Sequence, residues 1–146
     1  MENIKKWFII FVVMGCAYSN IELLFRGYTH PSMIIVGGLC GLLIGMINEG
    51  KADLKIWQQC AISTFIVLII EFISGYILNV KLNIGVWDYS DRPFNIMGQV
   101  CLLFGVLWFF LSVVAIWLDD FIRFKFFGEK YEGNLGSYFK RLITLK

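Results

Sequence analysis

One apolar run decides the fold of this chain: Phe65-Ile66-Val67-Leu68-Ile69-Ile70-Glu71-Phe72-Ile73. A carboxylate in such a run would face hydrocarbon, which is costly unless the group is paired, protonated or turned into a cavity lined by protein. An acidic side chain at membrane depth is therefore a functional candidate by default. Glu71 marks the expected functional centre of a small protein that crosses the membrane several times.

The composition also indicates a lipid environment. Of 146 residues, 58% are hydrophobic and only 16% are charged, and the mean hydropathy is +0.71. A soluble domain carries roughly 25% charged residues. The length fits one domain without a separate soluble module, and a formal net charge of +2 is too small to indicate a nucleic-acid partner.

Four apolar segments, at about residues 7–25, 32–47, 56–80 and 98–118, are candidates for transmembrane helices. A helix needs about 20 residues to cross roughly 30 Å of hydrocarbon, so the shorter second segment could instead be re-entrant. We favour a full span because an even number of spans agrees with the charge pattern. The expected fold is an all-α membrane protein: a bundle of four transmembrane helices over residues 1–128, with a structured outer loop before the last helix.

The distribution of basic residues predicts the orientation. With four spans, ten lysines and arginines lie on the side of both termini and three lie on the other side. The ten are Lys5, Lys6, Lys51, Lys55, Arg123, Lys125, Lys130, Lys140, Arg141 and Lys146. The three are Arg26, Lys81 and Arg92. We therefore expect a multi-pass protein of the plasma membrane with both termini in the cytoplasm.

Residues 1–15 also have features of a signal peptide, with two lysines, an apolar core and the ending Gly15-Cys16. The apolar run continues past Cys16 to Phe25, as it does in a retained anchor. We expect this segment to remain as the first span rather than to be cleaved.

The tail, residues 129–146, contains a helical pattern. Apolar side chains recur at i, i+3, i+4, i+7 and i+8, and Lys140 and Arg141 lie away from that face. The apolar positions are Leu135, Tyr138, Phe139, Leu142 and Ile143. This pattern predicts an amphipathic helix on the inner leaflet, and a frayed polar tail is the alternative.

Small residues line two of the expected spans. Gly37, Gly41 and Gly45 form a ridge in the second segment, which would let a neighbouring helix approach closely. The fourth segment carries a similar face, formed by Gly98, Cys101, Gly105, Ser112 and Ala115. We expect a homo-oligomer, for which these ridges offer a packing surface.

Two carboxylates are expected in the outer half of the membrane. Glu22 and Arg26 are i, i+4 neighbours in the favourable order. Glu71 lies about 13 Å deep, at 1.5 Å per residue from the end of its helix. These acids could line an outward-opening cavity with Arg26 and Arg92, binding a polar or charged solute or relaying a proton. They could instead form a buried ionic network that fixes helix register.

The loop before the fourth segment concentrates interface and turn residues. Trp87 and Tyr89 suit the membrane interface, and Pro93 predicts the first turn of a short helix, with Asp91 near its cap. This loop would cover the cavity. The expected ligand-binding residues are Glu22, Arg26, Glu71, Trp87, Asp88, Tyr89, Asp91, Arg92 and Asn95.

The same loop carries a family resemblance. Trp87-Asp88-Tyr89-Ser90 is followed by Pro93-Phe94-Asn95 and Gly98-Gln99, ahead of an aromatic helix with Trp108. Over about residues 15–128 the chain resembles the small bacterial membrane proteins called "putative ABC-transporter type IV" permeases. The resemblance implies a multi-helix bundle in the bacterial plasma membrane, and it implies no catalytic residues.

Three functions are compatible with these residues. The chain lacks a G-x-x-x-x-G-K-[ST] phosphate loop, so it would be at most the membrane partner of a separate ATPase. The first hypothesis is a transporter-like or channel-like subunit that binds its solute near Glu22, Glu71 and the outer loop. The second is an intramembrane enzyme acting on lipid, with Glu71 or Asp88 as acid or base. The third is a non-catalytic scaffold or regulator that uses the basic tail.

No cofactor, metal site or catalytic group is expected. The four cysteines have no C-x-x-C spacing and no histidine partner, so neither zinc binding nor a disulfide framework is indicated. They are Cys16, Cys40, Cys60 and Cys101. The single histidine, His30, precedes Pro31 in a short loop.

Overall fold

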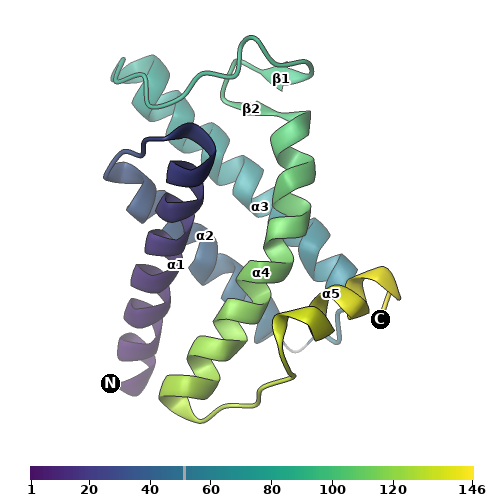
Figure 1. Cartoon of the computed structure of the whole chain (residues 1–146). Helices are drawn as coiled ribbons and strands as arrows, with labels where there is room; N and C mark the ends of the chain where they lie inside the picture. The colour runs from purple at the N-terminus through teal and green to yellow at the C-terminus, as the bar shows by residue number, and fades with distance from the viewer. Residues whose placement is uncertain (51) are drawn as a thin grey trace.

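A computed structural model describes residues 1–50 and 52–146, and Lys51, counted above among the inner basic residues, lies outside them. Within these residues the chain forms five α-helices, one π-helix and two short strands (Figure 1). In chain order these are α1 (Glu2–Arg26), α2 (Ser32–Asn48), α3 (Ile56–Gly75), the π-helix η1 (Tyr76–Lys81), β1 (Asn95–Ile96), β2 (Val100–Cys101), α4 (Leu102–Phe127) and α5 (Leu135–Ile143).

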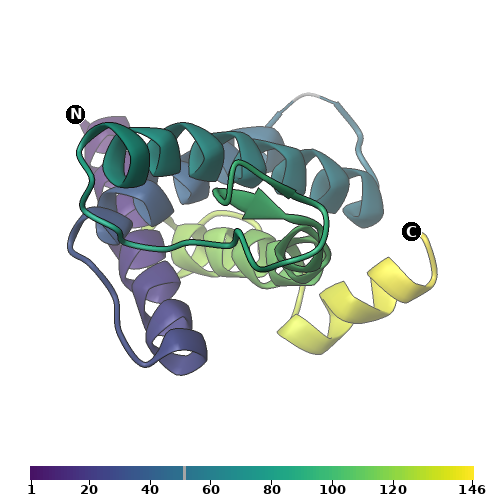
Figure 2. The same ribbon diagram turned by 90° about the horizontal axis from the view of Figure 1, so that it is seen from above.

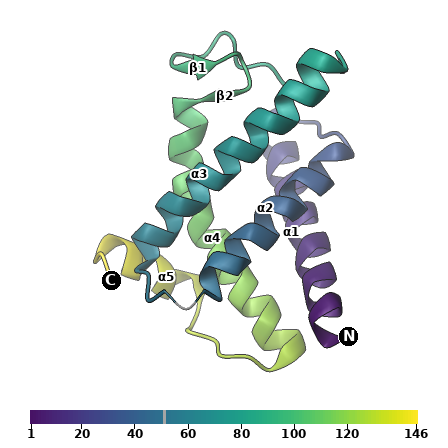
Figure 3. The same ribbon diagram turned by 180° about the vertical axis from the view of Figure 1, so that it is seen from behind.

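The long helices alternate in direction and pack as two pairs, α1 with α2 and α3 with α4, while α2 also contacts α3 and α4 (Figures 1 and 3). The two strands lie at one end of the molecule, which we call the hairpin end. Both termini and α5 lie at the opposite end, the terminal end. Viewed from the hairpin end, the strands sit over the start of α4, and α5 lies beside the bundle (Figure 2).

The helices have the character of a membrane protein. Over the part of the chain that the structure describes, three helices are long and apolar enough to cross a bilayer: Glu2–Arg26, Ile56–Lys81 and Leu102–Phe127. The helix α2, at 17 residues, is apolar but shorter. The predicted all-helical fold is thus confirmed, with three candidate transmembrane helices. A fourth membrane crossing by α2 stays a prediction.

The glycine ridge of α2 is used inside the chain. A Cβ atom at Gly37 would overlap the side chain of Tyr18 in α1, and one at Gly41 would overlap Met14. The absence of these atoms lets the backbones of α1 and α2 approach closely. The expected packing role is therefore right, but the partner is α1 and not a second copy. A homo-oligomer stays a prediction, without this ridge as its surface.

The fourth helix begins later than expected, because the outer loop is not helical. Asn95 pairs with Cys101 and Ile96 with Val100 in an antiparallel hairpin. The chain turns there through positive φ angles at Phe94 (55°) and Met97 (52°), which an α-helix does not allow. The short helix expected from Pro93 is wrong, and α4 starts at Leu102.

The tail forms the predicted amphipathic helix, so the frayed alternative is wrong, and the position of this helix on the inner leaflet stays a prediction. Asn134 caps α5, accepting a hydrogen bond from the backbone N–H of Ser137 at 3.0 Å. Tyr138 and Leu142 are buried in the core together with residues of α3 and α4. The apolar face of α5 is thus largely occupied by protein, and Ile143 stays exposed.

The close approach of α1 and α2 gives a first prediction. Gly41→Ala places a methyl group where Met14 lies, and overpacking of this kind lowers the free energy of unfolding by roughly 1–3 kcal/mol. Gly105→Ala is the matched control, because its new Cβ would lie 3.5 Å from the Leu68 side chain, an ordinary contact. Thermal unfolding in detergent measures both. Equal stability of the two variants would contradict the packing described here.

Candidate functional site

Glu71 is buried in α3 and is held by side chains of two other helices. The Tyr18 hydroxyl of α1 donates to Glu71 Oε1 at 2.5 Å, and Trp108 Nε1 of α4 donates to the same oxygen at 3.0 Å. The side chain is 3% exposed. Among the described residues, Oε2 has no hydrogen-bond partner. The carboxyl group therefore has one saturated oxygen and one free acceptor.

Two features of the bundle bring these donors together. Gly37 has no Cβ, so the base of the Tyr18 side chain lies directly against α2. The ring of Tyr18 then stacks on Trp108, with centroids 5.0 Å apart and planes 18° apart. Such stacking fixes both rings, and their donors point to the same carboxyl oxygen. Glu71 is thus the meeting point of α1, α3 and α4.

A small cavity adjoins Glu71, with about 40 Å³ of space for water-sized groups. One water needs roughly 10–15 Å³ by this measure, so the cavity holds a few waters or one small polar group. Three charged side chains line it, those of Glu22, Arg26 and Glu71, and so do the polar aromatic residues Tyr18, Tyr89 and Trp108. With both acids ionised, the formal charge of this lining is −1.

Arg26 is committed to Glu22 and to the loop. The two side chains form an ion pair, and Thr29 Oγ1 donates to Glu22 at 2.7 Å. Arg26 Nη1 also donates to the carbonyl of Val86 at 3.3 Å. The expected pairing of Glu22 with Arg26 is therefore correct. Glu71, by contrast, is held by the neutral donors Tyr18 and Trp108 and, among the described residues, takes no part in an ionic network.

The outer loop forms a second, larger hollow at the hairpin end, with a volume of about 350 Å³. Its lining includes six of the predicted binding residues: Arg26, Trp87, Asp88, Tyr89, Asp91 and Arg92. Tyr89 stacks on Phe104 with centroids 4.6 Å apart, and it lines both hollows. Burial raises the pKa of the Tyr89 hydroxyl well above its usual value, and the nearby Glu71 charge adds to this. The hydroxyl between the two hollows is thus neutral.

The remaining predicted residues serve the loop itself. Asn95 Nδ2 donates to the carbonyls of Ser90 and Arg92, and Asn95 Oδ1 accepts from Gly98 N at 2.9 Å. Asp88 accepts from Ser90 N at 2.9 Å and from its hydroxyl, and these bonds lower the pKa of Asp88. Arg92 is about half exposed and lies 3.9 Å from Asp91. Asn95 is therefore a turn residue rather than part of a hollow.

Comparison with protein families assigns the chain. Residues 6–143 match the family described as "Putative ABC-transporter type IV". The chain belongs to this family. The resemblance carried by the outer loop is therefore confirmed, and a transporter-related membrane protein is the broad assignment. No solved structure matches the chain.

The sequence did not predict that Asn79 and Gln99 hold the outer loop on the helical bundle. Asn79 Oδ1, in the π-helix η1, accepts from Val86 N at 2.7 Å, and Asn79 Nδ2 donates to Gln99 Oε1 at 2.9 Å. Trp87 Nε1 donates to the Gln99 carbonyl at 2.9 Å. Trp87 is thus a buried anchor of the loop. An asparagine at the end of an apolar span was the available signal.

An ionic network at the terminal end was also missed. Arg123 Nε donates to Asp119 Oδ2 at 2.8 Å, and the guanidinium pairs with Glu49 at the end of α2. Lys6 of α1 pairs with Glu129. A Cβ at Gly45 would lie 2.6 Å from Asp119 Oδ1, so glycine makes room for this acid. The i, i+4 spacing of Asp119 and Arg123 was a signal that could have found it.

The network extends to α5 through Asp120. Asn48 Nδ2 donates to Asp120 Oδ1 at 2.5 Å, and the Tyr138 hydroxyl donates to Oδ2. Burial raises the pKa of the Tyr138 hydroxyl, and the hydrogen bond to Asp120 raises it further, so the hydroxyl stays protonated. The terminal ends of α2, α4 and α5 are therefore joined by polar contacts.

The network gives a second prediction. Arg123→Met leaves the fully buried Asp119 without its cation, which lowers the free energy of unfolding by roughly 3–5 kcal/mol. Arg141→Met is the control, because its pair with Glu132 is largely exposed and contributes about 1 kcal/mol or less. Denaturant unfolding of the two purified variants checks this. A loss for Arg123→Met no larger than the control would contradict a structural role for the network.

Proposed function

We propose that this chain is the membrane subunit of a transport system and that it binds a small polar or positively charged group beside Glu71. The observation that carries the proposal is the free acceptor of a buried carboxyl group. Glu71 lines the cavity, and its Oε2 has no donor within the described chain. Buried polar atoms nearly always have a partner, so a donor from a solute fits this position.

The size and charge of the cavity support a small cation. A space of about 40 Å³ admits a group of a few heavy atoms, such as an ammonium. The cation of Arg26 is already bound to Glu22, so the uncompensated charge in the lining belongs to Glu71. An ammonium brings donors only, which matches an oxygen that can only accept while ionised.

The surrounding structure supports an approach from the hairpin end. The larger hollow under the outer loop shares Arg26, Tyr89 and Phe104 with the cavity. We propose four spans with both termini in the cytoplasm, which places this hollow outside the plasma membrane. The sequence has no phosphate loop of its own, so a separate ATPase partner would supply the energy.

The proposal gives a third prediction. The thermal unfolding midpoint of the purified protein rises in ammonium chloride relative to N-methylglucamine chloride at equal ionic strength, because the larger cation does not fit beside Glu71. A ligand at 100 times its Kd stabilises by about 2.7 kcal/mol, a shift of a few degrees. Glu71→Gln abolishes the difference between the two salts.

The matched control is Glu2→Gln, at an exposed acid of the first turn of α1. This variant keeps the response of the unmodified protein to ammonium. The proposal fails if the unmodified protein does not distinguish the two cations, or if a folded Glu71→Gln variant distinguishes them equally well.

A further inference from the structure

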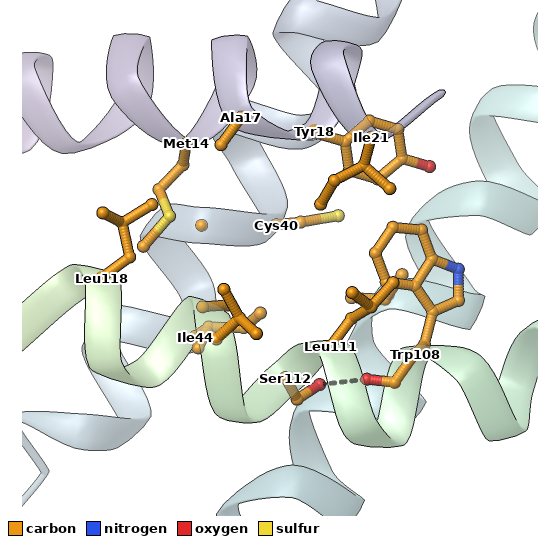
Figure 4. Close-up of a pocket in the computed structure, with 15 residues that line it drawn as sticks. Met14, Ala17, Tyr18, Ile21, Cys40, Ile44, Trp108, Leu111, Ser112 and Leu118 are labelled. Carbon is orange, nitrogen blue, oxygen red and sulfur yellow. Dashed lines mark hydrogen bonds between the residues drawn. The ribbon is translucent and has the colours of Figure 1, made fainter. Parts of the chain in front are cut away.

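An apolar groove continues from the Glu71 cavity toward the terminal end. Figure 4 shows α1 and α4 on its two sides and α2 behind. Met14, Ala17 and Ile21 form one wall, and Leu111 and Leu118 are on the other. The floor is made by the buried side chains of Cys40 and Ile44, with their exposed fractions at 3% each.

The groove and the cavity are continuous. Tyr18, Ile21, Trp108 and Leu111 line both. The stacked rings of Tyr18 and Trp108 therefore present a carbon surface to the groove while their donors bind Glu71 on the other side. A ligand that fits both spaces has a polar head beside the carboxyl group and an apolar chain across the aromatic rings.

The length of the groove sets the size of that chain. From Met14 to Ile21 the α1 wall advances seven residues, or about 10 Å at 1.5 Å per residue. This length suits a short alkyl chain of roughly eight carbons, at somewhat more than 1 Å per methylene. Ala17, Ile21 and Leu111 are only partly buried, so the groove is open along its side. Between helices long enough to span a bilayer, that side faces lipid.

We propose that the ligand of this site is an amphiphilic amine, with its ammonium at Glu71 Oε2 and its alkyl chain in the groove between α1 and α4. This inference rests on the proposed function, because it assigns a chain to the cation placed beside Glu71. The ammonium takes the oxygen of Glu71 to which no described residue donates a hydrogen bond. The alkyl chain of the ligand lies in surroundings as apolar as the membrane. The ligand can therefore enter the groove laterally from the bilayer.

The test measures binding to the full chain in lipid nanodiscs by titration calorimetry, with empty nanodiscs as the blank for partition into lipid. The probes are ammonium, octylammonium and octanol. Octylammonium binds more tightly than ammonium, and octanol, which lacks the charge, shows no saturable binding. Ala17→Leu fills the groove, so the advantage of octylammonium is lost while the affinity for ammonium is kept.

Ala61→Leu is the matched control, because Ala61 is exposed on α3 and lines neither the groove nor the cavity. It retains the advantage of octylammonium. If Ala17→Leu loses ammonium binding as well, Ala115→Leu blocks the same groove from α4 and takes its place.

The outcomes separate the two proposals. Equal affinity for ammonium and octylammonium, or an advantage of octylammonium that survives filling of the groove, means that the groove does not bind the alkyl chain. Either result overturns the inference, while the cation site at Glu71 stands. If neither cation binds, or if both bind to Glu71→Gln as they do to the unmodified protein, the proposed function fails instead.

Discussion

The bundle depends on how one carboxyl group is accommodated in an apolar setting. Glu71 receives hydrogen bonds from Tyr18 and Trp108 on a single oxygen, so α1, α3 and α4 must meet at one height. A hydrogen bond to a charged group is worth roughly 1.5–3 kcal/mol. Neutral donors stabilise the carboxylate but leave its negative charge in place, whereas an arginine would cancel that charge. Under the proposed function, this charge is what a cation or a proton would bind.

Charge is divided between the two ends of the molecule. At the terminal end, Arg123 forms ion pairs with both Asp119 and Glu49, which join α2 to α4. Near the hairpin end, Glu22 and Arg26 are matched, and Glu71 is left with a free oxygen. The two interpretations of the intramembrane acids thus apply to different residues. Paired charges fix the helices, and the unpaired carboxyl group carries the proposed function.

The outer loop is held both by contacts to the helical bundle and by hydrogen bonds within the loop. Asn79 binds the backbone where the loop returns to the bundle, and Trp87 is buried against Gln99. Asn95 and Asp88 close the turn around Gly98, where a Cβ atom would lie 2.7 Å from Asp88 Oδ1. The large hollow is therefore formed by a folded structure whose Tyr89 side chain also borders the Glu71 cavity.

The sequence predicted the four long helices well, because long apolar segments leave few alternatives to a helix in lipid. Glu71 was identifiable, since a lone acid in such a run is rarely without a role. Its partners were not, because Tyr18 and Trp108 are common interfacial residues whose meeting depends on the rotation of three helices. The hairpin was missed because Pro93 suits a helix start and a turn equally well, and only the positive φ angles at Phe94 and Met97 distinguish them.

The most direct measurement is an experimental structure of the chain in lipid, at a resolution that resolves ordered solvent and small ligands. We predict density within hydrogen-bonding distance of Glu71 Oε2, in the space bounded by Tyr18, Trp108 and Arg26. A Glu71 side chain whose second oxygen is bound by Arg26, or by any other group of the protein, would contradict the account.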